Sequence, residues 1–262
     1  MKLQNKVAIV TGGAMGNGLG IVKVFLKYGA RVAIIDYSDT LDEVVNNFIG
    51  EGYDVKGYKA DIKNGEVIKQ IIPKIYKDFK SIDIVVNNAG ICKLETFENM
   101  SDELRDLHFD INIKGAWNVT KASLPYLKQS NEASIVNLSS VTGPMVADSG
   151  EVAYATTKAA LIGFTKGLAA ELVDDNIRVN AILPGYIKTP MVEQMANTTN
   201  PENPNTVIEG IASGIPMQRL GTIEELGELA AFLASSESSY ITAQSFVIDG
   251  GSTLPETMSM GV

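Results

Sequence analysis

The segment Lys6-Val-Ala-Ile-Val-Thr-Gly-Gly-Ala-Met-Gly-Asn-Gly18 decides the fold of this chain. Its β-branched run is typical of a strand buried on both faces, and the glycines that follow suit a tight turn. Apolar residues then recur at helical spacing over residues 19–28, and Gly29 is placed to end that helix. A glycine-rich turn between a strand and a helix gathers backbone N–H groups at the helix N-terminus, which favours an anion such as a phosphate.

The same alternation of strand and helix continues along the rest of the chain. Further strands are predicted at 31–35, 55–59, 82–86, 133–138, 178–183 and 245–248, and further helices at 39–49, 65–79, 102–127, 154–172 and 223–234. Strands and helices that alternate at this spacing form βαβ units with right-handed crossovers. We therefore predict an α/β fold: a single Rossmann-fold domain over residues 1–262, with a doubly wound, seven-stranded parallel sheet and helices on both faces.

Two segments fall outside this alternation. Prolines and asparagines over 184–216 indicate a loop or lid before the last helix, with the substrate lid itself at about 187–216. Met191 and Met195 in this segment either line a pocket for a bulky substrate or fill gaps in the core. A tail over 250–262 follows the last strand. We expect the lid and the tail to set specificity, although no residue pattern in them names a substrate.

The composition excludes several classes of protein. With 22 lysines and arginines against 31 aspartates and glutamates, the chain carries a formal charge of −9 and repels nucleic-acid backbones and anionic membrane surfaces. A single cysteine, Cys92, and a single histidine, His108, are too few for a disulfide or a metal site. The apolar run over 7–10 is too short for a signal peptide, and no stretch approaches a membrane span of about 20 apolar residues. We expect a cytoplasmic protein with no metal, nucleic-acid or membrane partner, in which Cys92 is not catalytic and His108 is structural.

An acidic residue stands where a dinucleotide's ribose would bind. Asp36 ends the predicted second strand, 18 residues beyond Gly18, close to the offset of roughly 20 residues expected for a ribose-binding acid. Its carboxylate would accept hydrogen bonds from both ribose hydroxyls and repel a 2′-phosphate, which favours NAD(H) over NADP(H). The alternative is that Asp36 caps the following helix. Asp61, after the third strand, is likewise either a helix cap or an adenine contact.

A tyrosine and a lysine lie four residues apart at the start of the helix over 154–172. Tyr154 and Lys158 therefore share one helix face. A free phenol has a pKa of about 10, but a neighbouring ammonium group and the positive nicotinamide ring of NAD⁺ both favour the phenolate. Tyrosine then becomes a workable general acid and base. Ser140, with Ser139 as its competitor, is placed to hold a substrate oxygen against the phenol.

Taken together, these motifs resemble the short-chain dehydrogenase/reductase family over nearly the whole chain. The landmarks occur in order: Thr11-Gly-Gly-Ala-Met-Gly-Asn-Gly18, Asn87-Asn-Ala-Gly90, Asn112 within Ile111-Asn-Ile-Lys114, Ser140, Tyr154, Lys158, Pro184-Gly185 with Thr189, and Asp249-Gly250-Gly251. Within the family, the stretches over 111–121, 139–143 and 250–257 are most similar to a bacterial subgroup, the UcpA-type oxidoreductases. The chain departs from the family pattern at Asn17, where isoleucine is usual, and in the step from Ser140 to Tyr154, which is one residue longer than is common.

The resemblance implies roles for individual residues. The catalytic tetrad would be Asn112, Ser140, Tyr154 and Lys158, with Asn112 anchoring a water that links Lys158 to solvent. Lys158 would also bind ribose. The implied cofactor-binding residues are Gly12, Gly16, Asn17, Gly18, Asp36, Asp61, Ile62, Asn88, Ala89, Gly90, Tyr154, Lys158, Pro184, Gly185, Ile187 and Thr189. The family's usual tetramer agrees with the small and apolar faces of the helices over 102–127 and 154–172, so we expect a homo-oligomer, either tetramer or dimer.

We therefore predict an NAD(H)-dependent oxidoreductase that interconverts a secondary alcohol and a ketone by hydride transfer, with a hydroxysteroid or another bulky alcohol as one candidate substrate. Two alternatives remain open at this point. One is a 3-oxoacyl thioester reductase that uses NADPH, for which Asp36 is awkward. The other is a non-catalytic regulator that senses dinucleotide, against which an intact tetrad argues.

Overall fold

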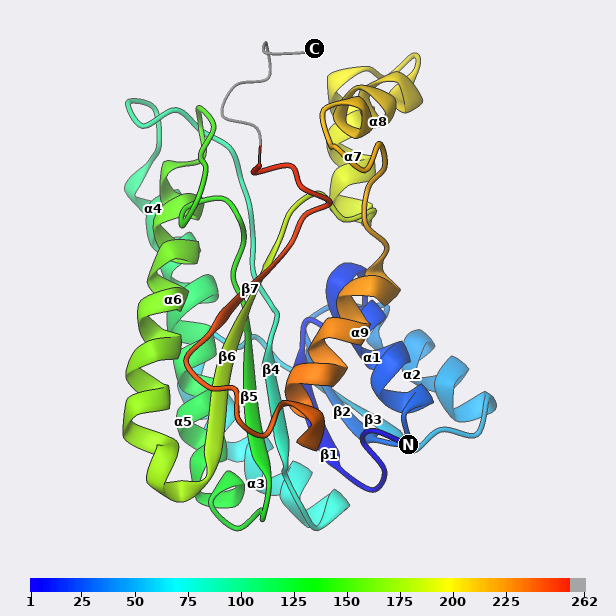
Figure 1. Cartoon of the computed structure of the whole chain (residues 1–262), viewed down its shortest axis with the longest axis vertical. Coiled ribbons are helices and arrows are strands. Elements are labelled where there is room, and N and C mark those ends of the chain that lie inside the picture. The colour runs from blue at the N-terminus through cyan, green and yellow to red at the C-terminus, as the bar shows by residue number, and fades with distance from the viewer. Residues whose placement is uncertain (255–262) are drawn as a thin grey trace.

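A parallel sheet in the strand order β3-β2-β1-β4-β5-β6-β7 runs through the protein (Figure 1). The computed structural model describes residues 1–254, so the end of the expected tail, residues 255–262, lies outside the described residues. The strands are β1 (Val7–Thr11), β2 (Arg31–Asp36), β3 (Val55–Lys59), β4 (Ile84–Asn87), β5 (Ala133–Leu138), β6 (Ile177–Pro184) and β7 (Ser245–Ile248). This architecture confirms the predicted α/β fold with its seven-stranded parallel sheet.

Helices cover both faces of the sheet, as Figure 1 shows. The helices are α1 (Gly16–Lys27), α2 (Leu41–Gly50), α3 (Gly65–Phe79), α4 (Asp102–Phe109), α5 (Ala116–Leu127), α6 (Val152–Leu172), α7 (Pro190–Thr199), α8 (Pro204–Ser213) and α9 (Ile223–Ala234). On β1, Ala8 and Val10 belong to the core shared with α1 and α9, whereas Val7 and Ile9 belong to the core shared with α3 and α5. This double burial explains the unbroken apolar run of the first strand.

The segment over 184–216 is not the irregular loop that its prolines suggested. It forms the two helices α7 and α8, which pack on each other beyond the carboxyl edge of the sheet (Figure 1). Pro190 and Pro204 stand in the first turns of these helices, where the missing N–H costs nothing and the fixed φ suits the helix. Two of the prolines that indicated a loop are therefore helix starts, and the role of this segment as a lid stays a prediction.

Two other elements differ from their predicted form. Helix α1 begins at Gly16, inside the glycine motif, three residues before the apolar pattern that predicted it. The predicted helix over 102–127 is interrupted, because residues Asp110–Gly115 form a π-helical segment, η1, between α4 and α5. Apolar periodicity detects neither feature, since glycines carry no hydrophobic signal and a π turn shifts the helical phase only locally.

Helices α1 and α9 approach closely through two glycines. A Cβ atom on Gly20 would lie 2.2 Å from the backbone oxygen of Ile223, and one on Gly227 would lie 2.7 Å from the oxygen of Gly20. Larger residues at either position would force the helices apart. This contact fixes α1, and with it the glycine turn at its start, against the rest of the molecule.

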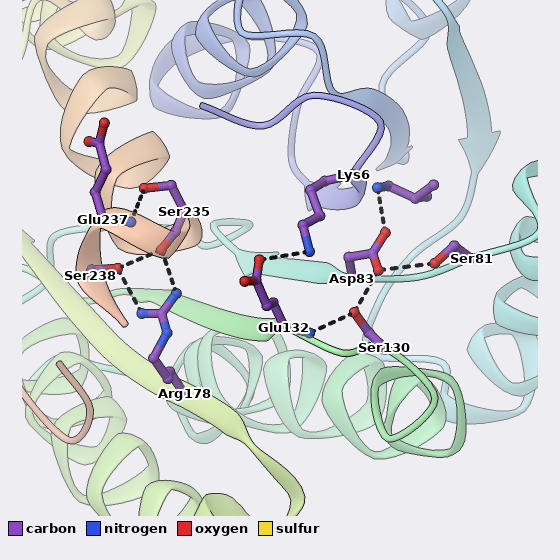
Figure 2. Close-up of polar contacts among 10 residues, drawn as sticks. Lys6, Ser81, Asp83, Ser130, Glu132, Arg178, Ser235, Glu237 and Ser238 are labelled. Atoms are coloured by element: carbon purple, nitrogen blue, oxygen red, sulfur yellow. Dashed lines mark hydrogen bonds and ion pairs between the residues drawn. The ribbon is translucent and has the colours of Figure 1, made fainter. Parts of the chain in front are cut away.

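The amino ends of the strands carry a network of polar side chains, drawn in Figure 2. The buried Asp83 carboxylate accepts hydrogen bonds from the Val7 N–H at 2.8 Å and from the hydroxyls of Ser81 and Ser130 at 3.0 and 2.6 Å. It thereby ties β1 to the segments that enter β4 and β5. Nearby, the exposed Glu132 pairs with Lys6 at 3.2 Å.

A second part of this network joins β6 to the end of α9. The Arg178 guanidinium donates to the Ser238 hydroxyl at 2.8 Å and to the Ser235 carbonyl at 2.9 Å (Figure 2). Burial lowers the pKa of Arg178 somewhat from its ordinary value. Both groups of contacts lie at the strand ends opposite the glycine turn, so we assign them to stability.

We predict that Asp83→Ala lowers the free energy of unfolding by about 2–4 kcal/mol, because three donors lose a buried charged acceptor. Glu132→Gln, which breaks an exposed ion pair in the same region, should cost less than about 1 kcal/mol. Urea denaturation of the two variants and the wild type measures both effects. Equal losses in the two variants would contradict the role of Asp83.

Candidate active site

The glycine turn after β1 forms one wall of the site at the carboxyl edge of the sheet. Gly12 and Gly16 have φ of +66° and +53°, a left-handed conformation that side chains disfavour. A Cβ atom on Gly18 would lie only 2.0 Å from the oxygen of Gly12, so the turn can close on α1 only with glycine there. The turn thus brings backbone N–H groups to the start of a helix, where an anion is stabilised.

Four hydrogen bonds hold this turn against the loop after β4. The Thr11 hydroxyl accepts hydrogen bonds from the N–H groups of Asn88 and Ala89 at 3.0 and 3.1 Å. The Asn88 amide in turn donates to the carbonyls of Thr11 and Gly12 at 2.9 and 3.1 Å. The structure therefore brings Asn88, Ala89 and Gly90 beside the glycine turn, as expected of cofactor-binding residues. Thr11 was not among the predicted site residues, although its hydroxyl positions both loops.

Asp36 lies at the end of β2 and is buried. One carboxylate oxygen accepts from the Ala14 N–H in the glycine turn at 2.9 Å, and the other accepts from the Ser38 N–H at 2.9 Å. The alternative that Asp36 caps the next helix is wrong, because Thr40 is the N-cap of α2. Each carboxylate oxygen keeps a further lone pair, so Asp36 can both hold the turn and accept from a ribose hydroxyl.

Asp61 and Ile62 follow β3 on the same side of the site. The Asp61 carboxylate accepts from the Lys63 N–H at 3.1 Å and pairs with its ammonium at 3.3 Å. The helix-cap alternative for Asp61 is also wrong, since Asn64 caps α3. Ile62 is buried, and its side chain packs so closely on η1 that a Cβ atom on Gly115 would lie 2.4 Å from it.

Tyr154, Lys158 and Ser140 meet beside these loops. Tyr154 and Lys158 lie on the first turns of α6, with the Lys158 ammonium 5.6 Å from the centre of the Tyr154 ring. This ammonium donates to the Leu138 carbonyl at 2.8 Å, at the end of β5. It also lies near Gly90, because a Cβ atom on that glycine would be 3.5 Å from the Lys158 nitrogen. The lysine thus reaches the loop after β4 as well as its own helix.

The two adjacent serines have different environments. The Ser139 hydroxyl is buried and donates to the Lys158 carbonyl at 2.7 Å, which attaches β5 to α6. The Ser140 hydroxyl accepts from the Thr142 N–H at 3.1 Å and interacts with the phenol of Tyr154. Ser139 therefore serves the fold, and Ser140 is the serine beside the phenol.

The buried Asn112 lies in the π-helical segment. Its amide oxygen accepts from the Ile91 N–H at 2.8 Å, and its amide nitrogen donates to the Ile91 carbonyl and the Thr157 hydroxyl, both at 3.0 Å. The Thr157 hydroxyl donates to the Tyr154 carbonyl at 2.8 Å. Asn112 thereby links η1, the loop after β4 and α6, so the four tetrad residues are brought into one region.

Burial dominates the protonation of the two titratable groups. It raises the pKa of Tyr154 well above its usual range, while the hydrogen bond from Ser140 acts in the opposite direction. Burial lowers the pKa of Lys158 to about 8. In the protein alone, Tyr154 is therefore a neutral phenol at physiological pH, and Lys158 keeps most of its charge.

The segment after β6 forms the facing wall. Pro184 ends β6, and the N–H of the next residue, Gly185, donates to the Ile248 carbonyl at 2.9 Å. Gly185 also lies close to Asp249, since a Cβ atom on the glycine would be 2.7 Å from the Asp249 side chain. Ile187 is buried and pairs with Gly221. Thr189 caps α7 and faces the glycine turn, since a Cβ atom on Gly16 would lie 3.7 Å from the Thr189 side chain.

These residues fit a nicotinamide dinucleotide. The glycine turn faces Thr189 and leads into the first turn of α1, where the amide oxygen of Asn17 is buried without a hydrogen-bond partner among the described residues. A buried acceptor of this kind calls for a donor that the protein does not supply. The ribose hydroxyls and the carboxamide N–H of a dinucleotide are such donors.

Two polar residues outside the tetrad have structural surroundings. His108 is fully buried, with one ring nitrogen accepting from the Lys93 N–H at 3.1 Å and the other 2.8 Å from the Leu104 carbonyl. Burial raises the pKa of the Cys92 thiol to about 11, so the reactive thiolate is disfavoured.

Residues 1–254 contain no group of three acidic, cysteine or histidine side chains arranged for a metal ion. No helix among them is long and apolar enough to cross a membrane.

The strand order, the glycine turn and the Ser140–Tyr154–Lys158 cluster define a nicotinamide-dependent oxidoreductase built on a Rossmann fold. The family described as Enoyl-(Acyl carrier protein) reductase matches residues 12–253. The oxidoreductase UcpA of Salmonella typhimurium is 49% identical over 261 residues, which cover 100% of this chain and 99% of the relative. This chain belongs to the short-chain dehydrogenase/reductase family, and it is an oxidoreductase.

Other relatives agree with this assignment. The 3-oxoacyl-[acyl-carrier-protein] reductase FabG of Thermotoga maritima is 39% identical over 252 residues, covering 96% of this chain and 99% of the relative. The structure of Thermoplasma acidophilum aldohexose dehydrogenase has a TM-score of 0.91 and 33% identity, covering 99% of this chain and 98% of the other. L-Sorbose reductase from Gluconobacter frateurii, solved with NADPH and L-sorbose, has a TM-score of 0.93 and 29% identity, covering 97% and 100%.

We predict that alanine substitutions of the two serines affect different properties, turnover for Ser140 and stability for Ser139. Ser140→Ala should reduce kcat/KM by about 10²- to 10³-fold, because the substrate oxygen loses a hydrogen-bond donor. Ser139→Ala should instead lower the free energy of unfolding by about 1–2 kcal/mol, through the lost buried hydrogen bond. Turnover with the best secondary alcohol of a panel and urea denaturation measure the two effects. A larger loss of turnover in Ser139→Ala would reverse the assignment.

Proposed function

We propose that this protein interconverts a secondary alcohol and a ketone with NAD(H), with Tyr154 as the group that transfers the proton. The observation that carries the proposal is the Tyr154 phenol, which interacts with Ser140 and has the Lys158 ammonium 5.6 Å from its ring centre. When bound, the nicotinamide ring donates or accepts the hydride. The similarity to an aldohexose dehydrogenase and an L-sorbose reductase supports a carbonyl and secondary-alcohol chemistry.

Each residue has a defined part in this reaction. In ketone reduction, the neutral Tyr154 phenol donates its proton to the substrate oxygen, while the Ser140 hydroxyl donates a hydrogen bond to the same oxygen. In alcohol oxidation, Tyr154 accepts that proton as a phenolate. The Lys158 ammonium favours the phenolate by its charge. Asn112 holds the helix that carries Lys158 against the loop after β4, through its hydrogen bonds with Thr157 and Ile91.

We propose NAD(H) as the preferred cofactor because of Asp36. A 2′-phosphate on the ribose would place a doubly charged anion against this carboxylate, which already holds the glycine turn. The L-sorbose reductase binds NADPH on the same fold, so the fold by itself does not decide the cofactor. The acidic side chain at the end of β2 carries the preference.

The second candidate is a 3-oxoacyl thioester reductase that uses NADPH. The 39% identity to the Thermotoga maritima FabG supports it, and Asp36 opposes it. A non-catalytic dinucleotide sensor is disfavoured, because a sensor has no need of the cluster formed by Ser140, Tyr154 and Lys158.

We further propose a cytoplasmic homo-oligomer, dimer or tetramer, that associates through α5 and α6. Trp117 on α5 is 54% exposed and stacks on Phe164 of α6 at 5.3 Å between ring centres. An exposed tryptophan that stacks on a half-buried phenylalanine of the neighbouring helix is typical of an interface.

Tyr154→Phe should reduce kcat by at least about 10³-fold while the Kd of NADH stays nearly unchanged, because only the proton-transferring hydroxyl is removed. Turnover of a secondary-alcohol panel and fluorescence titration of NADH measure the two quantities. Tyr53→Phe, which alters a tyrosine packed edge-on against Phe48, is the matched control and should behave as wild type. Wild-type turnover in Tyr154→Phe would falsify the assignment.

Asp36→Asn should narrow the preference for NADH over NADPH by about tenfold, which corresponds to about 1.4 kcal/mol of binding free energy. The amide still accepts the hydrogen bond from the glycine turn but no longer repels the 2′-phosphate. The control Asp39→Asn removes the same charge from an exposed carboxylate that pairs with Lys59. Equal affinity of the wild type for NADH and NADPH in fluorescence titrations would refute the preference.

A further inference from the structure

The only histidine of the chain, His108, is fully buried and lies four residues before Asn112. His108 belongs to α4, and Asn112 belongs to the π-helical segment that follows. Both side chains bind backbone groups of the loop after β4. Asn112 binds the N–H and the carbonyl of Ile91, and the Nε2 atom of His108 accepts from the Lys93 N–H at 3.1 Å. Two side chains from one helical stretch therefore hold alternate residues of this loop.

The two contacts of the His108 ring determine which nitrogen carries the hydrogen. The Leu104 carbonyl, 2.8 Å from Nδ1, can only accept a hydrogen bond, and the Lys93 N–H can only donate one. Nδ1 therefore carries the hydrogen and Nε2 offers its lone pair. The ring is attached to its own helix through Leu104 and to the loop through Lys93.

The loop after β4 depends on such contacts because its backbone is irregular. Residues 88–96 connect β4 to the turn before α4 as irregular backbone, so partners outside the loop must bind its polar groups. The first half of the loop is held at the glycine turn, through the hydrogen bonds between Asn88 and Thr11. That half serves the cofactor end of the site.

The second half of the loop, residues 91–95, is bound at three alternate positions. The N–H groups at these positions donate to Asn112, to His108 and, from Glu95 at 3.0 Å, to the Gly150 carbonyl. His108 holds the middle position. Its removal would leave the segment attached only at its two ends.

This second half runs beside the helix that carries the reacting residues. It starts after Gly90, where a Cβ atom would lie 3.5 Å from the Lys158 nitrogen. It ends at Glu95, which is bound to the turn that leads into α6. Helix α4, which carries His108, packs beside α6 (Figure 1). Both ends of the segment are therefore set relative to α6, and His108 sets its middle.

We propose that His108 is a positioning residue for the reaction, because it fixes the middle of the loop after β4 beside the helix of Tyr154 and Lys158. The sequence favoured a structural role for this histidine, and its bond to Lys93 adds a role in turnover. This inference rests on the proposed function, since turnover of an alcohol is the property that a displaced loop would change. Cofactor affinity should not change, because the glycine turn holds the first half of the loop separately.

Two substitutions separate the two hydrogen bonds of His108. Glutamine reaches as far as Nε2 and can still accept from the Lys93 N–H, whereas asparagine reaches only as far as Nδ1 and can bond only to Leu104. His108→Asn should lower kcat/KM for the best secondary alcohol of a panel by about 10- to 100-fold, through the misplaced loop. His108→Gln should stay close to the wild type. The Kd of NADH should be unchanged in both variants.

The two variants are matched controls for stability, because both remove the buried ring. Their melting temperatures should fall by similar amounts, so a difference in turnover between them cannot come from stability. Wild-type turnover in His108→Asn, or equal losses in the two variants, would overturn the inference and leave His108 a purely structural residue.

Two further measurements do not depend on turnover. Hydrogen–deuterium exchange of a peptide over residues 91–96 should be faster in His108→Asn than in the wild type, while a peptide over the glycine turn exchanges as before. In untagged wild-type protein labelled with heavy nitrogen at histidine only, nuclear magnetic resonance should show one ring with its hydrogen on Nδ1. A hydrogen on Nε2, or unchanged exchange over residues 91–96, would overturn the inference. Absence of turnover with every alcohol, together with the expected exchange and ring hydrogen, would overturn the proposed function and not the anchoring of the loop.

Discussion

The close contact between the glycine turn and the loop after β4 is the constraint on which the rest of the site depends. In a doubly wound sheet, the chain leaves neighbouring strands β1 and β4 in opposite directions, and a crevice opens between their carboxyl ends. Thr11 and Asn88 hold the two loops together across this point through backbone and side-chain hydrogen bonds. Gly18 permits the turn to close on α1, because any Cβ atom there would collide with Gly12. Without these contacts, the crevice would have no defined width.

The same loops connect the cofactor end of the site to its reacting end. Asp36 holds the glycine turn from the side of β2 through Ala14. Beyond Asn88, the chain passes Gly90 and Ile91, where Asn112 binds both the N–H and the carbonyl of Ile91. Asn112 also reaches α6 through Thr157. One series of hydrogen bonds therefore joins the glycine turn to the helix that carries Tyr154, so cofactor binding and proton transfer would share these supports under the proposed function.

Much of the fold and of the site could be predicted from the sequence, because they depend on local patterns. The buried strands have unbroken apolar runs, and the spacing of Tyr154 and Lys158 places both on one helix face. What escaped prediction depends on tertiary contacts. The π-helical segment around Asn112 is supported by partners in the loop after β4 and in α6, which periodicity does not reveal. Pro190 has two opposite meanings in sequence, loop or helix start, and only the fold around Thr189 selects between them. The two serines are equivalent by pattern and differ only in whether the hydroxyl faces α6 or the phenol.

Electrostatics explains why a half-buried tyrosine suits the proposed chemistry. Burial keeps the Tyr154 phenol protonated in the protein alone, and it brings the pKa of Lys158 down to about 8, so most of the lysine remains charged at physiological pH. Under the proposed function, the phenol beside a neutral reduced nicotinamide therefore stays an acid, which is the form that ketone reduction needs. Beside a positively charged oxidised ring the phenolate is stabilised, which is the form that alcohol oxidation needs. Under the proposed function, the protonation of Tyr154 would thus follow the redox state of the cofactor, with Lys158 as the neighbouring charge in both directions.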